Sequence, residues 1–593
     1  MDLESIESIV LSYPKLHQRI DGRSDIRQKA LKLLDEIKAD YSKAGIAATA
    51  KFLGVTLKRL YNDIHITTHQ EVDLKQMAKD SNIVFVPNHQ SHADYLALNY
   101  VLYHEYHLPV HIAGGVNLNI FPIGKIFRKS GCFFIRRSFI SDILYKLTLE
   151  AYLYYLLIKG YPIEFFFEGG RSRTGKLLPP RFGLYQMLLE AHSHIPDGMR
   201  RELKFIPVSI AHEYLAEQKS MAGELKGKKK KKESSGQLIK LLGLVARQFG
   251  SVHLKFGRPV SSIGFNNSDE LKRVTQDLAF QCFRVVGRNM VVTPTALISM
   301  ILLDEPVGAV KFKDILSKAR AVVSYCQQFD VPLSSTLEWD RIEETIRQGL
   351  KLLISNGQVE RIGKKKQSHN FYSIKTDARG ELLYYKNSIL HHFLVPSIMN
   401  IACINIFNGT ITNVEGMRTL LISQRNQLKY EFYLPLVKSM QQQALQIISI
   451  CVGKSVKNIV EGMELSHREL YTLVSHISVF SHSCTYISAG YFLTAKSLKE
   501  LALEHEQQFT LDQFKERCEE LFHFELELGR VIQYPESFSP PVVKSSLSYF
   551  ENMGLIKREL NTFRVIKPER LDEVVKKYER QLTEQLTFAA GHS

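Results

Sequence analysis

The sequence predicts an α/β domain, with a central sheet flanked by helices, between an N-terminal helical region and a large, mostly helical C-terminal region. Apolar residues recur at helical spacing up to about residue 70 and again beyond residue 293. Between these regions, short apolar runs alternate with helical segments, which is typical of a sheet with helices packed on its faces. We therefore expect three parts, formed by residues 1–72, 73–292 and 293–593.

The composition points to anionic partners. The 593 residues include 77 Lys and Arg against 61 Asp and Glu, a formal net charge of +16, which favours nucleic acid, acidic lipid headgroups or phosphorylated substrates. The seven cysteines show no CxxC or zinc-ligand spacing, so we expect free thiols in a reducing compartment and no metal site. The acidic N-terminus is unlike a secretory signal, and no uninterrupted apolar run reaches the length of a membrane span. Membrane contact should therefore be peripheral.

The N-terminal region is expected to be helical. Residues 26–37 carry apolar side chains at helical spacing, and residues 47–64 continue the pattern. Such a stripe usually marks core packing, and a membrane-resting face is the less common alternative.

The first motif of the α/β part follows an apolar run at residues 83–86, which predicts a buried strand entering a turn. Residues 95–102 predict the next helix, so His89 and Asp94 lie where a strand is followed by a helix, a common position for chemistry in α/β folds. Residues five apart are poorly aligned on one helix. We therefore place His89 in the turn and Asp94 in the first helical turn, reaching back.

A carboxylate in that position can fix the orientation and tautomer of the imidazole and stabilise its protonated form, which makes His89 a candidate general base. The His-x4-Asp pattern is short, and alone it is more often coincidence than catalysis. His92 is a rival partner for Asp94, or simply a polar residue near the start of the helix. The motifs downstream decide between these interpretations.

Further apolar runs predict strands at residues 109–115, 131–135, 163–167 and 203–210. The predicted strand at residues 131–135 is followed directly by Arg136 and Arg137, although adjacent arginines at a strand end often face water. The predicted strand at residues 163–167 is followed by a loop rich in Gly and Arg at residues 168–176. Glycines permit close approach of main-chain amides to a ligand, and arginines suit phosphate oxygens, so we interpret this loop as an anion cradle rather than a solvated basic turn.

Four blocks, in this order and spacing, resemble the glycerolipid acyltransferase signature. They are His89-x4-Asp94, Gly131-x-Phe133-Phe134-Ile135-Arg136-Arg137, Phe167-Glu168-Gly169-Gly170-Arg171-Ser172 and Ile206-Pro207-Val208. Residues 117–119, 168–175 and 224–227 are similar to the bacterial membrane-associated glycerol-3-phosphate acyltransferases, and dihydroxyacetone-phosphate acyltransferase is a more distant relative. The resemblance is strong across roughly residues 80–260, and four ordered blocks are far more specific than one motif.

Some residues depart from the pattern of that family. Gln90 stands where this branch usually has Arg, Asn88 is more typical of relatives that acylate lysophosphatidate, and Gly170 replaces the Thr common in the wider superfamily. The chain also begins later than the long bacterial enzymes, so we expect it to lack much of their N-terminal region. These differences bear on substrate details more than on reaction type.

The resemblance implies transfer of an acyl group from acyl-CoA or acyl carrier protein to the 1-hydroxyl of glycerol 3-phosphate, which makes lysophosphatidate in the first step of phospholipid synthesis. Dihydroxyacetone phosphate is the alternative acceptor, and no cofactor is expected beyond the thioester co-substrate. His89 would be the general base, oriented by Asp94. The implied substrate-binding residues are Arg136, Arg137, Glu168, Gly169, Arg171, Ser172 and Pro207.

The roles within this set differ. The arginines and Ser172 would hold the acceptor's phosphate. Glu168 would hydrogen-bond a glycerol hydroxyl or an arginine, and backbone amides near Gly169 are candidates for the oxyanion site. Pro207 would help to shape the acyl pocket.

A lysine-rich run occupies residues 226–232, outside the four blocks. A solvated, mobile loop is the simpler explanation, and docking to anionic headgroups is the functional one. Nuclear targeting is a third explanation, which the bacterial resemblance disfavours. Together with that resemblance, the charge leads us to expect a peripheral protein on the cytoplasmic side of the cell inner membrane.

The C-terminal region contains two stretches with one layout, at residues 346–374 and 543–566: a helix, a glycine and a short hairpin. This layout resembles the end of a winged-helix module that occurs twice, and together with the net charge it raises the alternative of a nucleic-acid-binding protein. We favour divergent packing units over DNA readers, because a nucleic-acid-binding protein would leave His89, Asp94 and the Gly- and Arg-rich loop without a purpose. No nucleic-acid partner is therefore expected.

Two further expectations concern the same half of the chain. A lipid-binding scaffold that has lost catalysis is another alternative, but the presence of both His89 and Asp94 argues against it. Residues 389–407 are apolar and interrupted, which favours a core helix over a membrane-facing surface.

Overall fold

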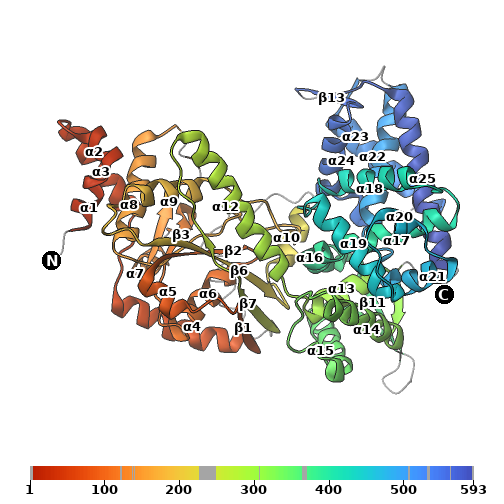
Figure 1. Cartoon of the computed structure of the whole chain (residues 1–593), viewed down its shortest axis with the longest axis horizontal. Helices are drawn as coiled ribbons and strands as arrows, with labels where there is room; N and C mark the ends of the chain where they lie inside the picture. The colour runs from red at the N-terminus through yellow and green to blue at the C-terminus, as the bar shows by residue number, and fades with distance from the viewer. Residues whose placement is uncertain are drawn as a thin grey trace. The chain divides into compact units, whose positions relative to one another are not determined.

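The computed structural model of the chain describes residues 5–119, 123–136, 138, 141–225, 249–305, 308–363, 370–504, 508–529, 535–560 and 562–590. The chain divides into two compact units (Figure 1). The N-terminal unit comprises residues 1–172, 178–217 and 230–293. The C-terminal unit comprises residues 173–177, 218–229 and 294–593.

The N-terminal unit is built around a mixed sheet. Its helices are α1 (Ile6–Ser12), α2 (Pro14–Ile20), α3 (Ser24–Ile37), α4 (Lys43–Leu60), α5 (Leu74–Asp80), α6 (Ala93–His104), the short 3-10 helix η1 (Val116–Leu118), α7 (Ile123–Lys129), α8 (Ile143–Ile158), α9 (Gly183–Ser193) and α12 (Ser268–Asn289). Its strands are β1 (Asp63–Thr68), β2 (Ser81–Pro87), β3 (His111–Gly115), β4 (Cys132–Ile135), β5 (Ile163–Glu164), β6 (Glu202–His212), β7 (Ser251–Phe256) and β8 (Val260–Ser261).

The strands form an eight-stranded sheet in the order β1-β7-β6-β2-β5-β3-β4, with β8 paired to β6. Strands β7 and β8 run antiparallel to β6, and the other neighbours are parallel. Helices α8, α9 and α12 cover one face, and α4, α5 and α6 cover the other (Figure 1). The predicted α/β class is therefore confirmed.

The centre of the sheet is apolar on both faces. Every residue of β2 is buried, and Val84 lies opposite Phe205 of β6. Strands covered by helices on both sides need such continuous apolar runs rather than alternating ones. Full burial of a side chain as large as Phe205 stabilises the fold by about 1.5–3 kcal/mol. This rigid centre fixes where β2, β5 and β6 end.

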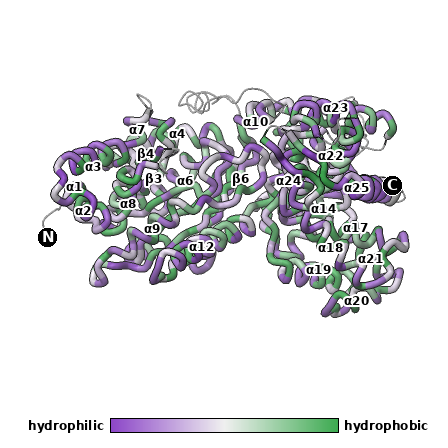
Figure 2. Tube along the Cα trace, turned by 90° about the horizontal axis from the view of Figure 1, so that it is seen from above, coloured by the Kyte–Doolittle hydropathy of each residue, from purple (hydrophilic) through white to green (hydrophobic). Residues whose placement is uncertain are grey.

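Helix α12 shows the complementary pattern of a helix that packs on a sheet. The Asn267 side chain accepts hydrogen bonds from the backbone N–H groups of Asp269 and Glu270, which caps the first turn. Hydrophilic and hydrophobic positions alternate along the helix (Figure 2), and Leu271, Leu278 and other apolar residues at helical spacing are buried.

The prediction of helix up to residue 72 is wrong after Leu60, where α4 ends. Strand β1 follows and pairs in parallel with β7, with Ile64 opposite Val252 and Ile66 opposite Leu254. The alternation of Ile64 and Ile66 is too short to interrupt the helical pattern in the sequence, and β1 is an edge strand whose pairing with β7 spans almost 190 residues. The pairing, rather than local propensity, makes this segment a strand.

The N-terminal helices pack against α8 within the same unit. Tyr13 donates a hydrogen bond from its hydroxyl to Glu150, and Lys15 Nζ lies 3.2 Å from the same carboxylate. Lys15 also lies 3.0 Å from Glu190 on α9. These contacts attach α1 and α2 to the helices that cover the sheet.

The C-terminal unit is mainly helical. Its helices are α10 (Gln218–Leu225), α13 (Pro294–Leu303), α14 (Phe312–Gln328), α15 (Ile342–Ser355), α16 (Arg379–Ile389), α17 (Leu394–Phe407), α18 (Val414–Leu428), α19 (Val437–Val452), α20 (Ile459–Met463), α21 (His467–Ile477), α22 (Thr485–Glu504), α23 (Leu511–Glu527), α24 (Pro540–Asn552) and α25 (Pro568–Ala590). Short 3-10 helices are η2 (Trp339–Arg341), η3 (Thr376–Ala378), η4 (Leu390–His392), η5 (Ser478–Phe480) and η6 (Pro535–Phe538). Its strands are β9 (Ala309–Lys311), β10 (Val359–Ile362), β11 (Phe371–Ile374), β12 (Gln508–Thr510), β13 (Ile556–Glu559) and β14 (Thr562–Val565).

Two segments of this unit share one architecture. The first runs α13-β9-α14-α15-β10-β11 and the second α22-β12-α23-α24-β13-β14. Their three-stranded sheets have the equivalent orders β10-β11-β9 and β13-β14-β12. The order of helix, strand, helix, helix and hairpin extends the likeness to a winged helix beyond the hairpins seen in the sequence.

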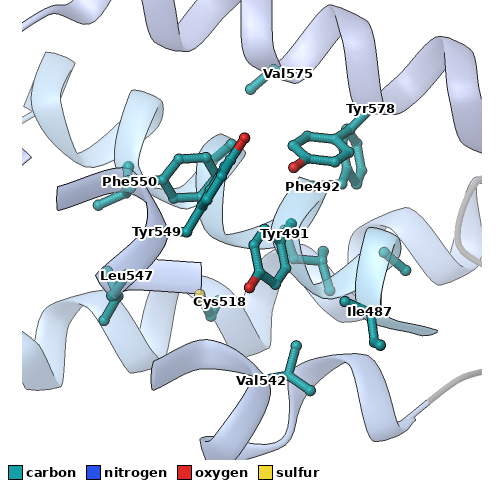
Figure 3. Packing of buried hydrophobic residues seen from close by; sticks show 14 of the residues in the cluster. Ile487, Tyr491, Phe492, Cys518, Val542, Leu547, Tyr549, Phe550, Val575 and Tyr578 are labelled. Atoms are coloured by element: carbon teal, nitrogen blue, oxygen red, sulfur yellow. The ribbon is translucent and has the colours of Figure 1, made fainter. Parts of the chain in front are cut away.

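Helix α22 lies at the centre of the second segment. Its Tyr491 packs among Tyr549 and Phe550 of α24 and Tyr578 of α25, with ring centroids 5.4, 6.1 and 6.3 Å away (Figure 3). All four rings are buried in one hydrophobic cluster. Aromatic packing of this kind holds the helices together without any need for a ligand.

Helix α17 is a core helix, as its composition favoured. Every residue from Leu394 to Asn405 is buried. Within the described ranges, no single helix is both long and apolar enough to cross a membrane, and one pair bent by 80°, Thr376–His392 with Leu394–Phe407, meets the requirements of length and composition.

Candidate active site

The candidate site lies in the N-terminal unit, where β2, β5 and β6 end at one edge of the sheet. His89 follows β2, Glu168 follows β5, and His212 is the last residue of β6. These three strands are adjacent and parallel, so their carboxyl ends bring residues far apart in the sequence together.

Asn88 fixes the point at which the chain leaves β2. Its backbone N–H donates to the carbonyl of Val208, its side-chain Nδ2 donates to the carbonyl of Ile210 at 3.1 Å, and its Oδ1 accepts from the Ile210 N–H at 2.7 Å. The side-chain amide thus takes the place of a backbone peptide in the ladder to β6. The next residue, His89, is therefore released from the strand at a fixed position.

His89 and Asp94 are brought together as their spacing predicts. Asp94 lies in the first turn of α6, and its Oδ2 is 2.9 Å from His89 Nδ1. An ionised carboxylate only accepts hydrogen bonds, so Nδ1 carries the proton and Nε2 keeps its lone pair. The imidazole packs on the ring of Phe166 with 4.1 Å between centroids, and the His89 side chain is 14% exposed. The geometry is that of a base with a fixed tautomer and an accessible nitrogen.

The Asp94 carboxylate is fully buried and accepts several hydrogen bonds from protein donors. Besides His89, its Oδ2 accepts from the backbone N–H groups of Gln90 at 2.6 Å and Ser91 at 2.8 Å. Its Oδ1 lies 2.6 Å from Nε2 of His212. Burial alone would raise the pKa of Asp94, but the hydrogen bonds from His212 and His89 outweigh it and hold the pKa below its ordinary value. Asp94 therefore stays ionised, and His89 and His212, rather than His92, are its imidazole partners.

Glu168 is buried and accepts hydrogen bonds from the backbone of two loops. Its Oε1 accepts a hydrogen bond from the His89 N–H at 3.0 Å, and its Oε2 accepts from the Leu178 N–H at 3.3 Å. Burial raises the pKa of Glu168 well above its ordinary value. The hydrogen-bond partners of this carboxyl group are therefore backbone N–H groups rather than an arginine.

The Gly- and Arg-rich loop lies directly beside His89. The Ser172 N–H donates to the His89 carbonyl at 2.9 Å, so His89 is bonded to both ends of the segment that runs from Glu168 to Ser172. Gly169 has a φ of +66°, a conformation that side-chain-bearing residues rarely adopt, which explains the glycine there. The loop and the imidazole therefore belong to one site.

Arg171 and Glu217 connect this loop to the turn after β2. Arg171 is buried, and its Nη1 lies 3.4 Å from Oε1 of Glu217. Glu217 also accepts from the Ser91 hydroxyl at 3.0 and 2.9 Å and from the His92 N–H at 3.1 Å. The guanidinium and the imidazole thus share one framework.

Arg136 lies in a different environment. Its Nε and Nη2 donate to both oxygens of Glu36 at 2.7 and 2.6 Å, and its Nη1 lies 3.1 Å from Asp142. Its guanidinium also stacks over the ring of Tyr145 at 4.5 Å. This is a bidentate link between the strand β4 and helix α3, so a structural role accounts for Arg136. Arg137 lies outside the described residues.

Pro207 lies inside β6, opposite Val86 of β2, and is buried. Its carbonyl accepts a hydrogen bond from the Gly257 N–H at 2.8 Å. Its position in the centre of the sheet explains its apolar character, and its predicted contribution to an acyl pocket stays a prediction.

Three residues of the site were not predicted from the sequence: Asn88, whose side-chain amide pairs with the backbone of β6, His212 and Glu217. A signal for His212 existed, since it lies two residues after the apolar run at residues 203–210, much as His89 lies three residues after the run at residues 83–86. For Glu217 we find no such signal. All seven cysteines lie in the described ranges and are free thiols, and the described residues contain no group of His, Cys, Asp or Glu arranged to hold a metal ion.

Family comparisons agree with the geometry. A model described as "Acyltransferase" matches residues 65–211, which hold His89, Asp94 and the Gly- and Arg-rich loop. A model described as "Glycerol-3-phosphate acyltransferase C-terminal region" matches residues 221–559. The N-terminal unit is thus similar to acyltransferases in general, and the second match is more specific. The chain belongs to the glycerol-3-phosphate acyltransferase family.

Individual relatives carry the same name. A glycerol-3-phosphate acyltransferase of Pseudoalteromonas translucida (strain TAC 125) is 33% identical over 441 residues, covering 70% of this chain and 51% of the relative. Those of Shewanella woodyi (strain ATCC 51908 / MS32) and Pasteurella multocida (strain Pm70) are both 34% identical, over 396 and 391 residues, and each match covers 63% of this chain and 47% of the relative. The chain spans about half the length of the curated relatives it matches.

A solved structure, the 1-acyl-sn-glycerophosphate acyltransferase of Thermotoga maritima, overlaps with a TM-score of 0.24 at 17% identity, covering 46% of this chain and 88% of that one. An overlap at this level supports no further conclusion.

Proposed function

We propose that this protein transfers a fatty acyl group from a thioester to the 1-hydroxyl of glycerol 3-phosphate. The observation that carries the proposal is the bonding of His89 at one time to Asp94, through Nδ1, and to the Glu168–Ser172 segment, through its backbone. A base and a cationic loop in one framework suit an acceptor that is both an alcohol and a phosphate. Membership of the glycerol-3-phosphate acyltransferase family supports the same acceptor.

In the proposed reaction, Nε2 of His89 takes the proton of the acceptor's hydroxyl while its oxygen attacks the thioester carbonyl carbon. The carbon–oxygen bond forms, the carbon–sulfur bond breaks, and the leaving thiolate receives the proton from the imidazolium. The products are an ester and a free thiol, and no covalent acyl-enzyme is needed. Buried, ionised Asp94 stabilises the imidazolium between the two proton transfers.

The acceptor's phosphate would bind at Arg171 and Ser172, with Arg137 as a further candidate. Arg171 already faces Glu217, and the planar fork of a guanidinium can serve two anions at once. Glu217 would then hold the guanidinium in place rather than compete for it. Arg136 is left out of the proposed phosphate site because Glu36 and Asp142 hold it.

The acyl donor is proposed to be acyl-CoA or acyl carrier protein, and the protein is proposed to act at the cytoplasmic side of the cell inner membrane, in peripheral contact with anionic lipids. The formal charge of +16 supports attraction to an anionic surface. The lysine-rich run at residues 226–232 lies outside the described residues. Co-sedimentation with vesicles should therefore be stronger for phosphatidylglycerol-containing vesicles than for pure phosphatidylcholine, and should weaken with salt.

The direct test is release of free thiol from palmitoyl-CoA by the purified chain, with glycerol 3-phosphate, dihydroxyacetone phosphate or glycerol as acceptor, in the presence of anionic vesicles. We expect release with glycerol 3-phosphate and little with glycerol, which lacks the phosphate. Equal rates with glycerol would contradict the phosphate site, and faster release with dihydroxyacetone phosphate would change the acceptor.

A further inference from the structure

The Asp94 carboxylate has a second imidazole partner, His212, on the side opposite His89. His212 ends β6 in the N-terminal unit, 118 residues after Asp94, and its Nε2 lies 2.6 Å from Asp94 Oδ1. Both side chains are 0% exposed. Among the hydrogen bonds that the described residues make to this carboxylate, the one from His212 serves Oδ1, while the other three converge on Oδ2.

Tyr61 supplies the next link. Its hydroxyl lies 3.0 Å from Nδ1 of His212, and it follows directly after α4. Because the ionised carboxylate only accepts, Nε2 of His212 must carry a proton, and in the neutral ring Nδ1 is then an acceptor for the Tyr61 O–H. The chain of contacts therefore runs from Tyr61 through His212 and Asp94 to His89.

This arrangement has a consequence for the base. A fully buried carboxylate oxygen without a donor carries a large desolvation penalty, which is relieved by protonation or by rotation of the group. Either change would remove the fixed negative charge that His89 faces at Nδ1. The hydrogen bond from His212 Nε2 to Oδ1 leaves Asp94 ionised, so a negative charge stays available to the His89 imidazolium.

We propose that His212 is a positioning residue, which acts through Asp94 to hold His89 in its reactive tautomer and orientation. This inference rests on the proposed function, because it assumes that His89 is the base. His212 itself has no contact with the acceptor or the thioester in this scheme. Its removal should therefore lower kcat and leave the KM for glycerol 3-phosphate nearly unchanged.

The experiment measures thiol release by the full chain with palmitoyl-CoA and glycerol 3-phosphate for the wild type, His212→Phe, His212→Gln and His212→Asn. Phe fills the space without a donor. The Gln amide reaches the position of Nε2 and can donate to Asp94, whereas the shorter Asn amide reaches only the position of Nδ1. We expect kcat to fall by about 10- to 100-fold in His212→Phe and His212→Asn. In His212→Gln, kcat should be at least tenfold higher than in those two variants.

A matched control tests whether any buried histidine of this sheet would behave alike. His253 of β7 is 4% exposed and lies on the neighbouring strand, and none of the hydrogen bonds to Asp94 described above comes from it. His253→Phe should keep kcat within a few-fold of the wild type. A loss equal to that of His212→Phe would overturn the proposal in favour of general packing.

A double variant separates a positioning role of His212 from a purely structural one. In a His89→Ala protein, His212→Phe should cause no further loss in the residual rate, because the residue through which it acts is gone. A further loss by the same factor would overturn the inference, as would equal kcat values for Gln and Asn. A wild-type protein that releases no thiol would instead refute the proposed function, so the two failures are distinguishable. If His212→Phe does not fold, the comparison of Gln with Asn and the effect of Tyr61→Phe, expected to be smaller, decide the question.

Discussion

Glu164 offers a prediction about stability and pH that follows directly from its burial. It is a residue of β5 with 0% exposure, and its Oε2 accepts a hydrogen bond from Asn99 Nδ2 at 2.9 Å. Burial, opposed by this hydrogen bond and assisted by the charge of Asp94, raises the pKa of Glu164 from 4.5 to about 8. The folded protein therefore keeps a proton at neutral pH that the unfolded chain has lost.

The sign and size of the effect follow from linkage. Between pH 4.5 and 8 the unfolded state binds fewer protons than the folded state at this site, so stability falls as the pH rises through this window. The slope is about 1.4 kcal/mol per pH unit, which gives about 3 kcal/mol between pH 5 and pH 7. Below pH 4.5 both states are protonated and above pH 8 both are ionised, so the contribution no longer changes there.

The variant Glu164→Gln keeps an oxygen for Asn99 and removes the titration. We expect its stability advantage over the wild type to grow by about 3 kcal/mol between pH 5 and pH 7, measured by urea unfolding with hydrogen exchange of the β2 amides as the readout. Glu105→Gln, at an exposed glutamate in the same unit, should track the wild type at every pH. A difference between Glu164→Gln and the wild type that stays constant with pH would refute the reasoning.

Two further predictions concern ion pairs. Arg136→Met should lower the stability of the N-terminal unit by about 1 kcal/mol, because its bidentate pair with Glu36 is one-third exposed; a tenfold rise in the KM for glycerol 3-phosphate without loss of stability would instead give this guanidinium to the acceptor. Lys176→Met should destabilise the C-terminal unit by about 3–5 kcal/mol in calorimetry, because it leaves the buried Glu431 unpaired. Lys499, whose ion pair with Asp572 lies at the surface, provides the comparison, since Lys499→Met should change stability far less than Lys176→Met, and equal losses would contradict the role of burial.

The parts of the site that the sequence predicted are those encoded locally. The apolar run before His89 and the spacing of five to Asp94 define a strand, a turn and a helix start within a dozen residues. The Gly- and Arg-rich loop after Ile163 was found for the same reason, since composition and a preceding strand are visible together. Local rules were sufficient there because few tertiary contacts compete with them.

The parts that were missed depend on pairing between distant segments. Arg136 and Glu36 are 100 residues apart, so nothing in the local pattern shows that this arginine is already neutralised. His212 reaches Asp94 only because β6 and β2 are parallel neighbours, and β1 becomes a strand only beside β7. The rule that polar residues after parallel strands meet at one edge, applied to β6 as it was to β2, would have found His212.

His89 is proposed to remove the proton of the acceptor's hydroxyl. The most direct test is kcat for thiol release from palmitoyl-CoA by His89→Ala at saturating glycerol 3-phosphate, with thermal unfolding measured on the same preparation. A fall of about 10²- to 10⁴-fold in a folded protein is predicted. A folded variant whose kcat stays within a few-fold of the wild type would contradict the account.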